Sequence, residues 1–194
     1  DINRAFTRML SGPMDYTPGG FRSLTPTDFK TQQRYHAPFV QTTRGQAVAM
    51  YVVYDSPFQM VSDSPEAYKN ADGAWADGAE FIQSVPASWD ETRVLAGDIG
   101  QYIVTARRKG DAWYIGAMTN EEGRTIEVPL NFLGKGAYSA HLQQDGADVN
   151  HLTVSDITVD AGKNLTLTLA PSGGAVAVIA PDAKGKKKIK AVMK

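Results

Sequence analysis

The second half of the sequence is divided into short segments in which apolar and polar residues alternate. Six such segments can be read between Gly100 and Pro181: GQYIVTARR, AWYIGAMTN, RTIEVPL, AYSAHLQQ, NLTLTLAP and GAVAVIAP. Turn-forming breaks separate them: KGD, EEG, GKG, QDG and PSGG. In NLTLTL the three leucines fall on one face and the threonines on the other. The pattern predicts an antiparallel β-sandwich over residues 89–182, which is the usual size for such a domain.

The first part, residues 1–88, consists of apolar runs separated by Pro/Gly-rich loops instead of regularly alternating segments. The apolar run AFTRML is expected to be a strand that ends in a Pro/Gly-rich loop. AVAMYVV fits a strand or a helix, but Thr42 and Thr43 offer an N-cap and the segment runs to Tyr54, which favours a helix. FQMVSD is expected to be a short strand, and WADGAEFIQSV a helix that Pro86 closes. This order predicts the closing portion of an α/β barrel or of a doubly wound sheet, followed by the sandwich. Because two units cannot close a barrel, we expect further sequence upstream.

Charge is distributed unevenly along the chain. The formal net charge is −1, but the last eleven residues hold six lysines and no acid, so the remaining 183 residues carry 14 basic and 21 acidic groups, a net of −7. We expect residues 183–194 to be a solvated, disordered tail, because no aromatics are interleaved for stacking on bases, and we expect no nucleic-acid partner. Cysteine is absent, which excludes disulfides and thiolate metal sites. No segment has the length or pattern of a membrane span or a signal peptide.

Few residues suggest catalytic chemistry. The three histidines, His36, His141 and His151, have no metal-ligand spacing and are expected on the surface or in loops. Nucleotide-binding and nucleophile-elbow motifs are missing. Two places put carboxylates on loops after predicted barrel strands: Asp15, and Asp63 with Glu66. Each carboxylate has an equally plausible structural role in capping a local turn.

Four stretches of the chain resemble glycoside hydrolase family 97: FTRMLSGPMDYTPGGF, VYDSPFQMVSDSPEAY, VPASWDETRVLAGDIGQYIVTARRKGDAWYIGAMTN and VPLNFLGKGAYSA. The resemblance covers about residues 6–181. It implies an exo-acting α-glucosidase or retaining α-galactosidase acting on oligosaccharides, typical of Bacteroidota and periplasmic or secreted. It also implies a calcium ion in the full-length enzyme, an N-terminal β-sandwich, a catalytic barrel and a C-terminal β-domain.

The resemblance places AFTRML at barrel strand seven and FQMVSD at barrel strand eight, so that residues 1–88 would be the last two β/α units of a (β/α)8 barrel. It places the catalytic carboxylates and the calcium ligands upstream of this sequence, so we expect no catalytic residue, no metal site and no activity in this chain alone. The chain would contribute one wall of the sugar pocket. The candidate substrate-binding residues are Met14, Asp15, Tyr16, Asp63 and Glu66.

Two alternatives stay open. The chain could be a non-catalytic carbohydrate-binding or structural β-module, for which two or three aromatics should be exposed on one sheet face; Trp113 and Tyr114 are adjacent and so point to opposite faces, which argues against it. It could also be part of a multi-chain assembly in which another polypeptide supplies the rest of the barrel.

Overall fold

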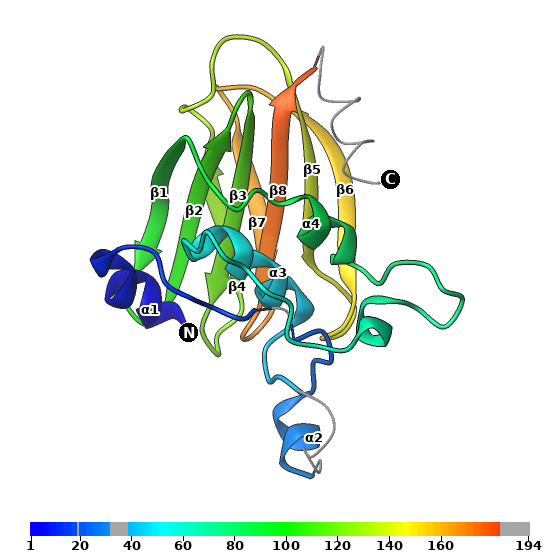
Figure 1. Cartoon of the computed structure of the whole chain (residues 1–194). Coiled ribbons are helices and arrows are strands. Elements are labelled where there is room, and N and C mark those ends of the chain that lie inside the picture. The colour runs from blue at the N-terminus through cyan, green and yellow to red at the C-terminus, as the bar shows by residue number, and fades with distance from the viewer. Residues whose placement is uncertain (19, 32–38, 183–194) are drawn as a thin grey trace.

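The computed structural model describes residues 1–18, 20–31 and 39–182. The lysine-rich tail, residues 183–194, and His36 lie outside the described residues. The described part contains two β-sheets, one helix laid across the larger sheet, and several short helices and loops at one side (Figure 1). The strands are β1 (Glu91–Asp98), β2 (Tyr102–Lys109), β3 (Ala112–Thr119), β4 (Arg124–Pro129), β5 (Tyr138–Asp145), β6 (Leu152–Val159), β7 (Asn164–Leu169) and β8 (Gly174–Pro181).

The two sheets form the predicted antiparallel sandwich. The larger sheet has the strand order β1-β2-β3-β8-β5-β6, and β4 pairs with β7 in the smaller one. The alternation in β7 is confirmed, since Leu165, Leu167 and Leu169 are buried between the sheets while the intervening threonines are exposed. All six predicted strand segments are strands in the structure. The sandwich core therefore follows from the period of the sequence.

The alternation of apolar and polar residues does not predict the two edge strands, β1 and β6. Both carry mostly exposed residues, and β1 contains a bulge between Val94 and Ala96. A strand that faces solvent on its outer edge and on much of its faces shows little apolar alternation, so its pattern is weak. Most of the stretch SWDETRVL, which spans the predicted boundary between residues 1–88 and 89–182, lies in β1.

Helix α3 (Arg44–Val53) covers the second face of the larger sheet, as Figure 1 shows. Its N-cap is Thr43, whose side chain accepts a hydrogen bond from the Gln46 amide at 3.1 Å, which confirms the predicted helix start. All ten of its residues are buried. A Cβ added to Gly116 in β3 would lie 2.7 Å from the Val52 Cβ, so glycine is what allows the helix to pack this closely.

Arg107 in β2 fixes the other end of α3. Its guanidinium donates to the carbonyls of Val52 at 2.6 Å and Val53 at 3.3 Å, and to the Thr92 hydroxyl at 2.9 Å. The Asp55 carboxylate lies 3.7 Å from the Arg107 guanidinium. Burial lowers the pKa of Arg107 below its ordinary value. Because the last carbonyls of a helix have no partner within the helix, this side chain completes the α3 C-terminus from the sheet.

The prediction of strands at AFTRML, before α3, and at FQMVSD, after α3, is wrong. AFTRML forms α1 (Ile2–Phe6) and a 3-10 turn, η1 (Arg8–Ser11). FQMVSD contains one isolated parallel bridge, between Tyr16 and Gln59, and no strand. Among the described residues no neighbouring strand runs beside either segment, so their backbone groups use local bonds such as Leu10 N to Thr7 O at 3.1 Å. The barrel units expected for residues 1–88 are therefore not visible as such.

The remaining helices are short. They are α2 (Pro26–Thr31), η2 (Pro65–Tyr68) and α4 (Ala79–Ser84), the last confirming the helix predicted before Pro86 with narrower bounds. None of the described helices is long and apolar enough to cross a membrane.

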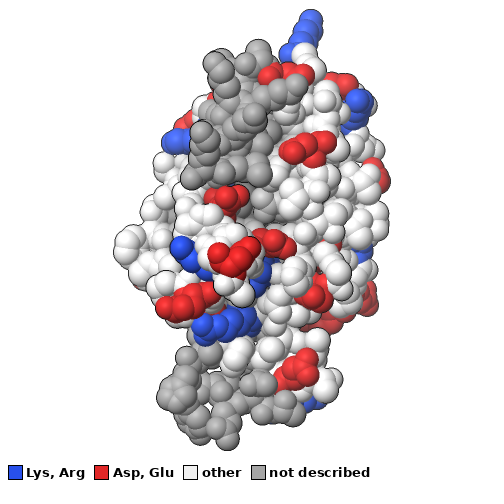
Figure 2. Space-filling view, turned by 90° about the vertical axis from the view of Figure 1, so that its right-hand side faces the viewer, with Lys and Arg blue, Asp and Glu red and all other residues white. Residues whose placement is uncertain are grey.

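On the face shown in Figure 2, acidic and basic side chains are interspersed among the described residues, without a continuous basic stripe.

Candidate functional site

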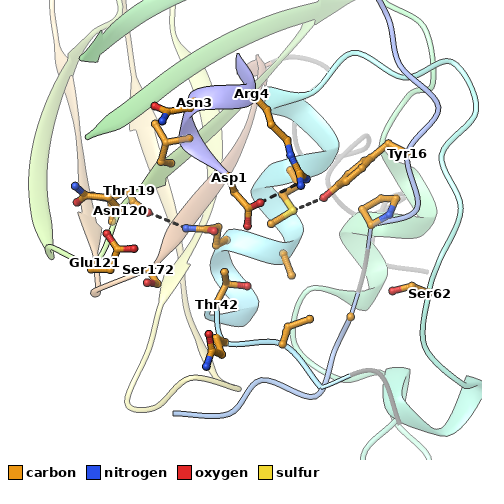
Figure 3. Close-up of a pocket in the computed structure, with 18 of the residues that line it drawn as sticks. Asp1, Asn3, Arg4, Tyr16, Thr42, Ser62, Thr119, Asn120, Glu121 and Ser172 are labelled. Carbon is orange, nitrogen blue, oxygen red and sulfur yellow. Dashed lines mark hydrogen bonds and ion pairs between the residues drawn. The ribbon is translucent and has the colours of Figure 1, made fainter. Parts of the chain in front are cut away.

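A cavity of about 670 Å³ lies between the N-terminal segment, the loop around Tyr16, α3 and the β1–β2, β3–β4 and β7–β8 connections (Figure 3). Polar groups from distant parts of the chain meet there because α3 brings its N-terminal half against the ends of β3 and β8. The residues labelled in Figure 3 are Asp1, Asn3, Arg4, Tyr16, Thr42, Ser62, Thr119, Asn120, Glu121 and Ser172. A concave site with convergent polar groups is the usual form of a small-molecule site.

Tyr16 is the one predicted site residue that lines this cavity. Its hydroxyl donates to the Met50 sulfur, and its ring lies edge-on to Tyr54 with the centroids 5.2 Å apart. Burial raises the pKa of Tyr16 above its ordinary value, so the phenol stays neutral at physiological pH. The ring therefore forms a fixed apolar wall with one polar edge.

Asp63 binds loops together instead of facing the cavity. Its carboxylate is fully buried and accepts hydrogen bonds from the amides of Phe21 at 3.1 Å and Ser64 at 2.8 Å. The Arg22 guanidinium lies 3.2 Å away. Its oxygens are thus engaged by the protein itself, and Asp63 acts as a latch between residues 20–23 and 63–64.

The other three candidates are peripheral to the cavity. Glu66 is exposed in η2, and its own backbone amide, followed by the Ser64 hydroxyl, lowers the pKa of its carboxyl. Met14 is half-buried, with its amide bonded to the Asp55 carbonyl at 3.0 Å. Asp15 is exposed and makes no hydrogen bond or ion pair with the described residues. The structure does bring Met14, Tyr16 and Phe21 beside the segment 55–63, through contacts with Asp55, Gln59 and Asp63.

The sequence does not predict the polar residues Gln46 and Ser172 in the cavity lining. Gln46 in α3 donates its side-chain amide to the carbonyls of Thr119 at 2.8 Å and Gly173 at 3.2 Å. Ser172 has a left-handed backbone conformation with φ 55°. Its amide donates to Asn120 O at 2.6 Å, and its carbonyl accepts from the Thr43 amide at 3.1 Å. The sequence marked PSGG only as a turn, since nothing local shows that this turn meets a helix.

His141 corrects a further expectation. It was expected on the surface or in a loop, but it lies in β5 with 4% of its surface exposed. Nδ1 lies 2.8 Å from the Asp156 carboxylate and Nε2 lies 3.0 Å from the Gln143 amide. A neighbouring carboxylate and amide supply the partners that a buried imidazole needs, so the ring is held by the sheet. His151, by contrast, lies in a loop and is exposed as expected.

Asp145 is a half-buried carboxylate at the end of β5. Burial raises its pKa, while the Thr43 hydroxyl at 2.5 Å and the amides of Ala170 at 2.8 Å and Gly174 at 2.9 Å donate to it. These donors come from the start of α3 and from the turn before β8. Asp145 therefore joins the helix to the sheet ends and is not one of the residues that line the cavity.

The cavity does not have the composition of a hydrolytic centre. Its two lining carboxylates, Asp1 and Glu121, are both exposed, in contrast to the apolar setting of a general acid. The described residues contain no group of three or more histidine, aspartate or glutamate side chains that could hold a metal ion. The described residues therefore do not gather the carboxylates from which calcium sites are commonly built.

Comparison with known proteins gives consistent matches. The family model described as "Glycosyl-hydrolase 97 C-terminal, oligomerisation" matches residues 88–180. A retaining alpha-galactosidase from Bacteroides thetaiotaomicron is 40% identical over 178 residues, which are 90% of this chain and 26% of that protein. A probable retaining alpha-galactosidase from Streptomyces bingchenggensis is 34% identical over 173 residues, which are 89% of this chain and 24% of that protein.

A solved structure agrees with these matches. A glycoside hydrolase family 97 enzyme from Pseudoalteromonas sp. strain K8, in complex with acarbose, has a TM-score of 0.78 and 40% identity, covering 92% of this chain and 28% of that one. The fold and these relatives define the class, a C-terminal portion of a glycoside hydrolase. More narrowly, the chain belongs to glycoside hydrolase family 97. It spans about a quarter of the length of the curated relatives that it matches.

Proposed function

We propose that the chain is the C-terminal portion of an exo-acting α-glycosidase of the retaining α-galactosidase type, which removes terminal sugars from oligosaccharides. The observation that carries this proposal is the 40% identity to a retaining alpha-galactosidase over 90% of the chain. An α-glucosidase is the alternative within the family, because a similar enzyme was solved with acarbose. The periplasmic or secreted location proposed for it follows from the family resemblance.

In this proposal residues 1–88 belong to a (β/α)8 barrel, in which AFTRML and FQMVSD would pair with barrel strands supplied by the rest of the polypeptide. Retaining glycosidases need two carboxyl groups about 5–5.5 Å apart. We place both, together with the calcium ligands, outside this chain. Tyr16 would form part of the pocket wall, with Met14 and Asp15 beside it. Asp63 would hold that loop in place, and Glu66 would lie at the rim.

The test compares this chain with a longer protein that includes the upstream sequence. The longer protein should hydrolyse p-nitrophenyl α-galactoside faster than p-nitrophenyl α-glucoside, and this chain should hydrolyse neither. In the longer protein, Tyr16→Ala should raise KM for an oligosaccharide more than Tyr16→Phe does, because phenylalanine keeps the ring. Val94→Ala, at an exposed position on β1, is the control. Turnover by this chain alone would show that the catalytic carboxylates have been placed wrongly.

A second proposed role is self-association through the β-sandwich. Two observations support it: the matched family model carries the word oligomerisation, and β6 is a free sheet edge among the described residues. The other edge, β1, is interrupted by its bulge and carries Glu91 and Arg93, which disfavour edge pairing. The β6 edge has an unbroken register with β5 and exposes Val154 and Ile157.

Light scattering after size exclusion tests this role. If β6 is the contact, Val154→Lys should convert an oligomer to a monomer, and Val94→Lys on β1 should leave it unchanged. Equal effects of the two changes would assign the contact elsewhere. Trp113 and Tyr114 do not form the exposed aromatic face that the binding-module alternative needs, because Trp113 packs on Phe132 between the sheets and Tyr114 packs on Trp89 beneath the helical layer.

A further inference from the structure

A small hairpin, residues 68–76, projects from the body of the protein between η2 and α4 (Figure 1). Lys69 and Trp75 form an antiparallel bridge across it. The amide of Asn70 donates to Ala74 O at 2.8 Å, and the amide of Ala76 donates to Tyr68 O at 2.9 Å. The hairpin is therefore held by backbone bonds and not only by its ends.

Its base is anchored in the core. Tyr68 has 8% of its surface exposed, and its ring lies 4.7 Å from that of Phe21, which is fully buried. After the hairpin, the Asp77 carboxylate accepts from the Leu152 amide at 3.0 Å, which joins the chain to the start of β6. The hairpin thus presents its outer side chains in a defined orientation.

Trp75 is the exposed aromatic of this hairpin. It keeps 42% of its surface in solvent, whereas Trp113 keeps 6%. The indole nitrogen of Trp75 has no hydrogen-bond partner among the described residues. The Lys69 ammonium lies 4.9 Å from the ring centroid and forms no ion pair with a described carboxylate. The indole therefore leaves apolar surface exposed to solvent on an ordered hairpin.

We propose that Trp75 and Lys69 form a carbohydrate contact, separate from the cavity, for a neutral hexose unit of an oligosaccharide. A pyranose presents a face of C–H groups that can cover the exposed indole, and hydroxyl groups around its edge that can accept from the Lys69 ammonium and the indole N–H. Because the hairpin is already ordered, binding costs little conformational entropy. The choice of an oligosaccharide as ligand rests on the proposed function.

Tryptophan fluorescence provides a direct measurement. The chain has three tryptophans, of which Trp75 is exposed, Trp89 is half-buried and Trp113 is buried. Quenching by acrylamide therefore reports mainly on Trp75. Raffinose or panose at millimolar concentration should reduce the quenching constant of the 194-residue chain, while sorbitol at the same concentration should not, since an open-chain polyol has no ring face to stack.

Calorimetric titration of matched variants completes the test. Trp75→Ala should weaken raffinose or panose binding by about tenfold or more, which is 1.4 kcal/mol, while Trp75→Phe should weaken it less. Lys69→Met should weaken binding without removing the sugar's effect on quenching. Ile99→Ala, at an exposed apolar position in the β1–β2 turn, should bind as the parent chain does.

The outcomes separate this proposal from the proposed function. No binding of either sugar by the parent chain, or unchanged affinity in Trp75→Ala, overturns the Trp75 contact. Neither result bears on hydrolysis by the longer protein, which is measured separately. Conversely, the longer protein could lack glycosidase activity while the Trp75→Ala variant of this chain loses sugar binding. That pair of results would remove the enzymatic proposal and keep the Trp75 contact.

Discussion

Replacement of Arg107 by methionine tests whether the helical layer and the sheet fold as one unit. Methionine keeps much of the aliphatic volume but leaves the carbonyls of Val52 and Val53 without their donor at a site where the side chain is only 5% exposed. A buried acceptor that loses its partner costs about 1–3 kcal/mol. Two acceptors give about 2–6 kcal/mol, and removal of a desolvated guanidinium offsets part of this, so we expect a loss of about 2–4 kcal/mol.

Urea unfolding followed by circular dichroism measures this loss. A domain stability of about 5–15 kcal/mol means that the change is a large fraction of the whole. With a slope of about 2 kcal/mol per molar urea, the midpoint should fall by about 1–2 M. Arg107→Lys should lie between the parent and Arg107→Met, because one ammonium reaches fewer acceptors. Arg93→Met is the surface control and should shift the free energy of unfolding by less than about 1 kcal/mol.

Either of two results would contradict the prediction for Arg107→Met. An unchanged midpoint in Arg107→Met would mean that water or another group satisfies the helix carbonyls. Two separate transitions, one for the helical signal and one for the sheet, would mean that α3 and the sandwich unfold independently. A single transition displaced to lower urea is the expected result, since α3 is buried along its whole length.

Three other predictions concern the packing of α3 and the loops. Gly116→Ala should cost about 1–3 kcal/mol in thermal unfolding because its Cβ would meet Val52 at 2.7 Å, whereas Gly162→Ala in an exposed turn should be nearly neutral. The raised pKa of Asp145 means that its stabilising contribution is present below its ordinary value of 3.8 and is lost as the pH rises through the raised value of the folded state. Asp145→Asn should therefore be more stable relative to the parent at pH 7 than at pH 4, and a difference that does not vary with pH would contradict this. Asp63→Ala should lower hydrogen-exchange protection of the Phe21 amide by about tenfold or more, because that amide loses its acceptor, and unchanged protection would show that the latch is not needed.

Local pattern was enough to predict much of this fold. Alternation identified six strands of the sandwich, and an N-cap threonine followed by an apolar run identified α3. These signals are local because a strand alternates every second residue and a cap satisfies amides within one turn. The edge strands β1 and β6 were missed, since their solvent-facing residues blur the alternation.

The segments AFTRML and FQMVSD show the limit of such patterns. Each is a short apolar run that suits a strand, yet a strand also needs a neighbour for its backbone groups. No such neighbour lies beside them among the described residues, and the first forms helical turns instead. Of the five predicted site residues, Tyr16 lines the cavity and Asp63 serves as a latch, a distinction that depends on contacts with residues far away in the sequence.

The antiparallel sandwich, the helix after Thr43 and the family can be predicted from the amino-acid sequence, because periodicity, capping and motif order are written along the chain. Three features could not be predicted in that way: Asp145 and Arg107 hold the two ends of α3, His141 is buried, and Trp75 stands in solvent on an ordered hairpin. Burial and hydrogen bonding are properties of groups that meet in space. A carboxylate or an indole has the same letter in the sequence whether its neighbours fold over it or leave it exposed.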